Sequence, residues 1–410
     1  MKIIDARNTR QVEALLTRNP RADRAFERRV HGIVDRVRKG GDHALAGFAR
    51  RFDGMRGAFE VSADEIREGA ASVAPDVRRA IRQAARHIAR VAFRQIPKHW
   101  DLSVVPGVSV EQRVEPLARV GCYVPGGRFP LPSSLLMTAV PARVAGVREV
   151  IVVCPRPEPA VMAAALEAGV TRLFRIGGAH AIAALAFGTE TIPRVDKIVG
   201  PGNRFVAAAK AYVANICAID FYAGPTEIVI VAGAGHAEWI AADLIAQAEH
   251  DPEARSILIT WSRALATRVA NAATRAAAGR EIVSRSLDTH GAIVVTRSAD
   301  EAIALANRFA PEHLVVDRES LIRRPLTAGA VFVGPFAAQA AGDYATGSNH
   351  VLPTAGAARF RGGLSAADFV RVMNVQRITR AGLARLAPIV VPLARAEGLT
   401  AHAESIEVRL

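Results

Sequence analysis

Four short polar clusters in this sequence combine residue types that bind metal ions or transfer protons. They are Gln247 with His250, Glu312 with His313, Asp343 with His350, and Glu397 with His402. Imidazole and carboxylate groups are common zinc ligands, and a catalytic zinc site leaves a position open for substrate. None of the spacings matches a short zinc signature such as HExxH. The residue types therefore indicate metal or acid–base chemistry without fixing the metal.

Each cluster also has a purely structural interpretation. Gln247 and His250, three positions apart on one predicted helix face, could belong to a polar helix end. Glu312 could begin a turn, and Asp343 could cap a loop. A single histidine is more often a surface or satisfied core residue than a ligand. Four clusters next to Gly- and Pro-marked turns favour a functional site more strongly than any one of them.

Three glycine-rich turns are candidates for binding a phosphate group. They lie at 123–127, 177–178 and 200–203, after predicted strands, and the last two precede predicted helices. Backbone N–H groups at such a turn can approach a phosphate at the helix N-terminus. None of the turns is a complete GxGxxG, and no acidic residue is evident about 20 positions later. A tight turn required only by the fold remains the alternative.

The elements that must position these residues alternate between strands and helices. Strands are predicted at 148–155, 171–178, 196–202, 226–233, 256–260 and 291–296, and helices at 160–169, 179–188, 205–214 and 237–249. This alternation predicts parallel sheets with crossover helices, enough for two Rossmann-like lobes. Ligands of such sheets bind beyond the carboxyl ends of the strands, where we expect the polar clusters.

Both ends of the chain are predicted to be helical. Apolar residues recur at helical spacing over 24–52 and again over about 63–93. Beyond Leu364 the chain is expected to return to helix, with Ser365 and Thr379 as N-caps.

Composition excludes several classes of protein. The 410 residues are 50% hydrophobic, yet no uncharged apolar run is long enough to cross a membrane. The formal charge is +14, but the basic residues are scattered along helix-like segments and form no nucleic-acid motif. The three cysteines are far apart, and the N-terminus lacks the apolar stretch of a secretory signal. We expect a cytoplasmic protein that binds neither membrane nor nucleic acid.

Seven longer runs together resemble the histidinol dehydrogenase family, from about residue 33 to the C-terminus. They are RVGCYVPGGRFPLPSSLLMTAVPARVAGV (119–147), GGAHAIAALAFGTETIPRVDKIVGPGN (177–203), AIDFYAGPTE (218–227), ADLIAQAEHDP (242–252), APEHL (310–314), GDYATGSNHVLPTAG (342–356) and EGLTAHAESIEVR (397–409). Their number and order make the resemblance specific.

The resemblance implies an α/β fold of two Rossmann-like lobes with parallel sheets, plus small helical N- and C-terminal pieces. We expect an N-terminal segment over 1–18, a first lobe from 19–118 and 229–362, and a second lobe from 119–228. A helical tail over 363–410 would reach the partner subunit of a homodimer. The reaction implied is oxidation of L-histidinol to L-histidine through an enzyme-held aldehyde, with zinc and two NAD.

The resemblance also implies roles for individual residues. Zinc would be held by Gln247, His250, Asp343 and His402. Glu312 and His313 would be the catalytic acid–base pair. Substrate would be bound by the zinc ligands and by Thr226, His313, His350 and Glu397. NAD would contact Tyr123, His180 and Asn203. Because the C-terminal segment reaches the partner, Glu397 and His402 would act in the other subunit's site.

Three positions depart from the family pattern. His180 replaces the usual Gln of GGAQA, Thr226 replaces the Ser of AGPSE, and Arg128-Phe129 replaces smaller residues. A related branch that oxidises a sulfonated diol departs from APEHL and GDY, whereas this chain retains both. Another small alcohol as substrate is the first alternative. A non-catalytic protein that binds NAD or an amino alcohol is the second, and it predicts the loss of site residues that are all present here.

Overall fold

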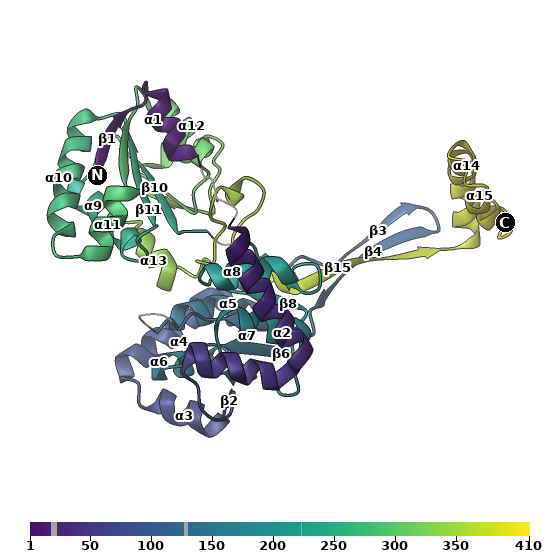
Figure 1. The fold of residues 1–410 in the computed structure, drawn as a ribbon. Coiled ribbons are helices and arrows are strands. Elements are labelled where there is room, and N and C mark those ends of the chain that lie inside the picture. The colour runs from purple at the N-terminus through teal and green to yellow at the C-terminus, as the bar shows by residue number, and fades with distance from the viewer. Residues whose placement is uncertain (18–22, 127–129, 223) are drawn as a thin grey trace.

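The computed structural model describes residues 1–17, 23–126, 130–222 and 224–410, which form two α/β lobes and a long projecting arm (Figure 1). We call the lobe that contains the N-terminal strand lobe 1 and the other lobe 2. The two lobes lie side by side, and the arm extends away from lobe 2 and ends in a pair of helices.

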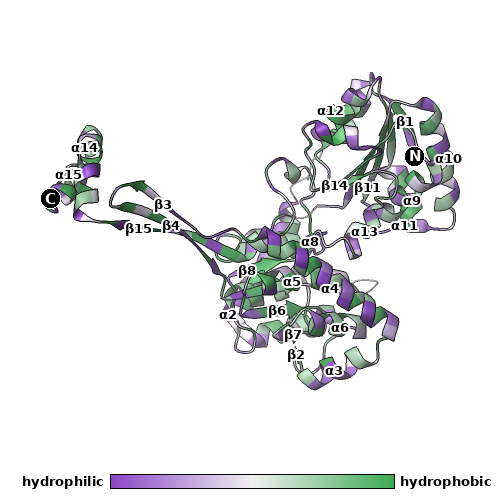
Figure 2. Ribbon diagram, turned by 180° about the vertical axis from the view of Figure 1, so that it is seen from behind, coloured by the Kyte–Doolittle hydropathy of each residue, from purple (hydrophilic) through white to green (hydrophobic). Residues whose placement is uncertain are grey.

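Lobe 1 is built on six parallel strands. Their order in the sheet is β1 (Lys2–Asp5), β12 (Ala292–Val295), β11 (Arg255–Thr260), β10 (Glu227–Val231), β13 (His313–Val316) and β14 (Ala330–Val333). The central strands are nearly continuous apolar runs such as EIVIV, because helices cover both faces of a parallel sheet. Figure 2 shows this hydrophobic interior. The strand order reverses between β10 and β13.

Helices cover the two faces of this sheet. Two of them, α9 (Ala237–Ala248) and α10 (Arg263–Ala277), pack on the face that carries Ile228 and Leu258. On the opposite face, α1 (Thr9–Leu16) and α12 (Ala299–Phe309) pack against Val229. The lobe is completed by α11 (Glu281–Thr289) and the short α13 (Gln339–Tyr344).

Lobe 2 has a second sheet of six strands, parallel except at one edge. The order is β2 (Glu60–Val61), β7 (Arg172–Phe174), β6 (Glu149–Val153), β5 (Arg119–Tyr123), β8 (Lys197–Val199) and β9 (Ala218–Ile219), with β2 antiparallel to β7. One face carries α3 (Ala63–Ala71), α4 (Pro75–Gln95), α5 (Pro132–Val144) and α6 (Pro159–Glu167). The other carries α2 (Arg24–Phe48), α7 (Gly178–Phe187) and α8 (Arg204–Val213).

The N-terminal helices belong to a different lobe from the one expected. The predicted division joins 19–118 to 229–362, but α2 packs on α7 and α4 packs on α5, both within lobe 2. Of the N-terminal part of the chain, only residues 1–17, which contain β1 and α1, belong to lobe 1. The apolar stripe of an amphipathic helix predicts that one face is buried, but it does not specify the sheet that buries it.

The arm is an antiparallel sheet that the sequence patterns did not reveal. It consists of β3 (Trp100–Val105), β4 (Val108–Pro116) and β15 (Val370–Ile378), followed by α14 (Arg380–Ala396) and α15 (Thr400–Glu407). The expectation of helix directly after Leu364 is therefore wrong, because residues 370–378 pair along the whole of β4. Thr379 is confirmed as the N-cap of α14, since it accepts the Gly382 N–H at 3.1 Å. Ser365 instead caps a short 3₁₀ turn over Ala366–Phe369.

A long connection joins lobe 1 to the root of the arm. It runs from α13 to β15, includes a 3₁₀ turn over Ala357–Arg359, and buries Val351, Leu364 and Phe369 in the core of lobe 2. A further 3₁₀ turn, Glu319–Arg323, lies in lobe 1. Within the described residues, no helix combines the length and apolar character needed to cross a membrane.

Candidate active site

The polar clusters of lobe 1 lie at the amino edge of its sheet, opposite to the carboxyl edge that was expected. Thr226 immediately precedes β10, and His313 is the first residue of β13. Gln247 lies in the last turn of α9, which follows β10 and runs back along the sheet. In an α/β unit the ends of the helices and the starts of the strands lie at the same, amino edge of the sheet. The expectation failed because the polar residues lie at strand starts and at a helix end.

Glu312 is buried and is held by one of its two carboxylate oxygens. Its Oε2 accepts the Thr226 hydroxyl at 2.5 Å and the Glu227 backbone N–H at 2.8 Å. Burial raises the pKa of Glu312 to about 8, and the two hydrogen bonds oppose that shift only in part. The group is therefore poised to exchange a proton near neutral pH.

His313 is oriented by a backbone contact that settles its tautomer. Its Nδ1 lies 3.1 Å from the Glu227 carbonyl oxygen, which can only accept, so Nδ1 carries the hydrogen. Nε2 is left as the basic nitrogen, 3.8 Å from Oδ1 of Asp343. Burial lowers the pKa of His313 and favours this neutral form.

A buried amide oxygen beside this pair lacks any partner among the described residues. Gln247 is fully buried, and its Nε2 donates to the Thr226 hydroxyl, while its Oε1 bonds to nothing. An unsatisfied buried carbonyl costs about 1–3 kcal/mol unless something coordinates it. The carboxylate of Asp343 lies on α13, which packs against α9, and its Oδ2 accepts the Gln339 amide at 2.8 Å.

Two more histidines lie at the same place. The Nδ1 of His350 donates to the Asp343 carbonyl at 3.0 Å, which leaves its Nε2 free. Burial lowers the pKa of His350, the Asp343 carboxylate opposes this shift, and His313 and His250 are near enough to add to it. The loop before His350 touches lobe 2, since Asn349 donates to the Met137 carbonyl at 2.6 Å. The cluster therefore lies against lobe 2.

The donor set of this cluster fits a zinc ion only in part within one chain. An amide oxygen, an imidazole and a carboxylate come from Gln247, His250 and Asp343, and the orphaned Oε1 of Gln247 is the observation that favours a metal. In the described part of the chain, however, no three His, Cys, Asp or Glu side chains are placed to hold a metal alone. A metal ion bound here would need at least one further ligand from outside this cluster.

Glu397 and His402 are not brought to this cluster within one chain. Glu397 is the C-cap of α14 and His402 lies on α15, and these two helices form the tip of the arm, far from lobe 1 (Figure 1). Both residues are exposed.

A second feature, a cavity of about 360 Å³, lies at the carboxyl edge of the lobe 2 sheet. Its walls include all three residues predicted to contact NAD, namely Tyr123, His180 and Asn203. These residues come from the ends of β5, β7 and β8 or from the helices that follow, as parallel-sheet binding sites require. Arg128-Phe129, one of the departures from the family pattern, lies outside the described residues.

Polar contacts inside this cavity fix several of its walls. The Gly178 N–H donates to the Tyr123 hydroxyl at 3.1 Å. His180 is buried, and its Nε2 lies 2.8 Å from the Asp53 carboxylate. Asn203 is the N-cap of α8, where its side-chain oxygen accepts two backbone N–H groups.

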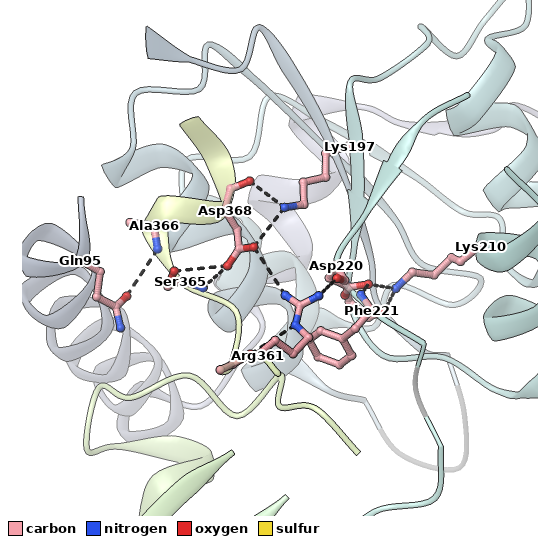
Figure 3. Close-up of polar contacts among 11 residues, drawn as sticks. Gln95, Lys197, Lys210, Asp220, Phe221, Arg361, Ser365, Ala366 and Asp368 are labelled. Carbon is pink, nitrogen blue, oxygen red and sulfur yellow. Dashed lines mark hydrogen bonds and ion pairs between the residues drawn. The ribbon is translucent and has the colours of Figure 1, made fainter. Parts of the chain in front are cut away.

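The turn at 200–203 is held by a buried ion pair, drawn in Figure 3. Lys210 and Asp220 pair directly; the Lys210 ammonium also donates to the Gly200 carbonyl at 3.0 Å, and Asp220 accepts the Gly200 N–H at 2.7 Å. Gly200 has φ +110°, and a Cβ there would lie 2.2 Å from the Tyr123 carbonyl oxygen. Both peptide groups of Gly200 are therefore clamped.

The same network reaches the root of the arm (Figure 3). Arg361 donates to the Asp220 carbonyl and lies 3.6 Å from Asp368, which also accepts Lys197 at 3.2 Å. The sequence patterns did not single out Asp53, Lys210, Asp220 or Gln339. They occur singly, far in the sequence from the residues they contact or within an ordinary helix, so no local pattern marks them.

Two lobes with an acid–base cluster on one and a sheet-edge cavity on the other make this an α/β enzyme. A family model described as histidinol dehydrogenase matches residues 16–410, and the chain belongs to that family. It is 45% identical over 428 residues to a histidinol dehydrogenase of Geobacter sulfurreducens, covering 100% of both chains. It is 46% identical over 394 residues to one of Methanothermobacter thermautotrophicus, covering 93% of this chain and 92% of the relative.

The fold is similar to that of a solved relative. A crystal structure of histidinol dehydrogenase from Elizabethkingia anophelis matches with a TM-score of 0.95 at 32% identity, covering 100% of this chain and 98% of the other. The match confirms the α/β fold of two parallel-sheet lobes and adds the small antiparallel sheet.

Proposed function

We propose that this chain is a zinc-dependent histidinol dehydrogenase that oxidises L-histidinol to L-histidine with two NAD, the final step of histidine biosynthesis. Family membership supports the activity. The structural observation that carries the proposal is the amino-edge cluster, where the buried acid–base pair Glu312 and His313 lies beside the unpartnered oxygen of Gln247. We propose a cytoplasmic location, which the three free, buried cysteines support.

The basic Nε2 of His313 is the atom suited to accept the alcohol proton while hydride leaves for NAD. The Glu227 carbonyl holds the ring in that tautomer throughout. The Nε2 of His350 is also free, and we assign it to substrate contact near the reacting carbon. Thr226 ties the cluster together, because its hydroxyl donates to Glu312 and accepts from Gln247.

Glu312 is suited to the second oxidation, in which water must add to the aldehyde. Its Oε2 is occupied by two donors, whereas Oε1 has no partner in the described residues and is the atom free to accept a proton from water. The same residue can then pass the proton to the aldehyde oxygen to complete the hydrate, because burial has raised the pKa of Glu312 to about 8.

Gln247, His250, Asp343 and the His402 of a second copy would hold the zinc ion. When bound, zinc supplies orientation and polarisation of the amino alcohol. Glu397 of the second copy would hold the substrate amine. NAD would occupy the lobe 2 cavity against Tyr123, His180 and Asn203.

The proposed assembly is a homodimer in which each arm completes the other copy's site. The arm and its tip helices expose many large apolar side chains: Trp100, Leu102, Val104, Val372, Ile378, Ile389, Leu393, Leu399 and Val408. Such a surface on a projecting element is typical of a protein interface. The separation of His402 from lobe 1 within one chain supports the exchange.

Co-expression of two inactive variants tests the shared site. We expect Gln247→Leu and His402→Ala each to abolish activity alone. In a mixed dimer, the intact lobe 1 of the His402 variant receives the intact arm of the Gln247 variant. One of the two sites is then complete and should be active. Activity that stays absent in the purified mixed dimer would show that His402 acts in its own chain or not at all.

The stoichiometry of NADH formation tests the function. With limiting L-histidinol we expect two NADH per substrate consumed and L-histidine as product, loss of activity after chelation, and recovery with added zinc. One NADH per substrate, or full activity in metal-free protein, contradicts the proposal. A panel of small alcohols that includes a sulfonated diol identifies any preferred alternative substrate.

A further inference from the structure

Asp53 projects into the wall of the lobe 2 cavity from an unexpected part of the chain. It ends the short π-helical turn Ala49–Asp53 that follows α2. Its Oδ2 accepts the Gly177 N–H at 3.0 Å and lies 2.8 Å from Nε2 of His180. Both partners belong to the turn between β7 and α7, so the carboxylate is fixed to the carboxyl edge of the sheet.

The second carboxylate oxygen is available to a ligand. Oδ1 of Asp53 has no hydrogen-bond partner among the described residues, and it is not sealed from solvent. The side chain is only 9% exposed, and it lines the cavity. A carboxylate held by two donors through one oxygen offers the other as a strong, fixed acceptor that carries negative charge.

The position of the cavity indicates which part of a dinucleotide would meet Asp53. Every lining residue lies between Ile33 and Phe205 in lobe 2, whereas the acid–base pair lies in lobe 1. The volume of about 360 Å³ is near the lower end of the range for small-molecule sites, about 300–1,000 Å³. The cavity therefore suits the half of NAD that is remote from the nicotinamide, and the exposed ring of Phe52 offers a face for the adenine.

We propose that Asp53, positioned by His180, binds the adenosine ribose hydroxyls of NAD and excludes the 2′-phosphate of NADP. The proposal rests on the proposed NAD site. Ribose hydroxyls donate to the free oxygen, whereas a phosphate would place like charge against a nearly buried carboxylate. Arg156 lies in the same cavity wall and would pair with the pyrophosphate of NAD. No acidic residue follows the glycine turns at the usual spacing, and Asp53, more than a hundred positions earlier in the chain, would take the place of that residue.

Direct binding measurements on the full-length protein test this assignment. By isothermal titration calorimetry, we expect Asp53→Asn to weaken NAD⁺ binding at least about tenfold, since a charge-assisted hydrogen bond is lost. NADP⁺ binding should stay the same or improve, so that the ratio of the two affinities falls at least about tenfold. Asp35→Asn on α2 is the matched control and should change neither affinity, since among the described residues the Asp35 carboxylate accepts a hydrogen bond only from the Tyr212 hydroxyl.

Substitutions of His180 test its positioning role. His180→Gln keeps a donor toward Asp53 and should retain the preference for NAD⁺, whereas His180→Leu should lose part of it. In the unmodified protein, an NAD⁺ analogue with 2′-deoxyadenosine should bind several-fold more weakly, a measurement that does not depend on a variant folding. Failure of the unmodified protein to bind NAD⁺ refutes the proposed function. Normal NAD⁺ binding with an unchanged affinity ratio in Asp53→Asn, or equal binding of the deoxy analogue, refutes this inference alone.

Discussion

The two lobes have similar sheets but place their polar sites at opposite edges. Lobe 2 has its cavity at the carboxyl edge, where loops after β5, β6, β7 and β8 surround it. Lobe 1 has its acid–base cluster at the amino edge, at the starts of β10 and β13 and the end of α9. The same architecture can therefore supply a cavity at one edge and a polar cluster at the other, and the function of an edge is set by its side chains.

This comparison assigns separate tasks to the two edges. In the proposed enzyme, the amino edge of lobe 1 holds the metal and moves protons, and the carboxyl edge of lobe 2 holds the dinucleotide. Substitutions at one edge should therefore leave the task of the other unchanged. Three variants test that separation.

The largest effect is expected for Gln247→Leu at the amino edge of lobe 1. The substitution removes the unpartnered Oε1 and keeps a similar volume, so metal affinity should fall by at least about 10²-fold and activity with it. Zinc content after dialysis and NAD⁺ binding are measured together. NAD⁺ affinity should not change. Gln11→Leu, an exposed glutamine on α1, is the control. A variant that retains its zinc would remove Gln247 from the ligand set.

A selective loss is expected for Glu312→Gln. The amide keeps the contacts of Oε2 but cannot take a proton from water, so oxidation of the aldehyde should fall by about 10²–10⁴-fold. Oxidation of the alcohol should be much less affected, and single-turnover kinetics with L-histidinol and with histidinal separate the two steps. The exposed Glu319→Gln is the control. Equal losses in both half-reactions would contradict the assigned role.

The smallest effect on chemistry is expected for Lys210→Met in lobe 2. Breaking a buried ion pair leaves Asp220 uncompensated and costs about 3–5 kcal/mol of stability. The loosened Gly200 turn should raise the KM for NAD with little change in kcat, and the zinc content should stay normal. Denaturant unfolding and steady-state kinetics measure both effects, with exposed Lys39→Met as the control. A reduced zinc content would show that the edges are coupled.

Regular patterns predicted the fold better than the site. The apolar runs and Ala-rich segments between residues 120 and 296 predicted β6, β7, β8, β10, β11 and β12 and the helices α6, α7, α8 and α9, because local periodicity determines these elements. The helices α5, α10 and α11 and the two-residue strand β9 were not predicted. The arm was missed because β15 gains its stability by pairing with β4, which lies more than 250 residues earlier. The lobe of α2 was missed for a similar reason, since its partner α7 lies far along the chain.

The candidate site was predictable in residue type but not in position. Glu312, His313 and Asp343 lie close together, while the roles that the resemblance implies for them stay predictions. Their location at the amino edge follows from the strand starts and the end of α9, whereas the general rule for parallel sheets led us to expect the carboxyl edge. Asp53 was missed for a different reason, because its contact with His180 spans 127 positions of the chain.

The projecting arm has a consequence for inheritance. In the proposed dimer, a harmful substitution at the tip of one chain's arm leaves the site on that chain's own lobe 1 intact. It inactivates the site on the partner's lobe 1 instead. A cell that carries one normal and one tip-defective allele would assemble dimers in which the healthy gene product is the disabled one. Dilution that separates the dimer would also lower activity, because a single subunit keeps its cofactor cavity but lacks a complete catalytic site.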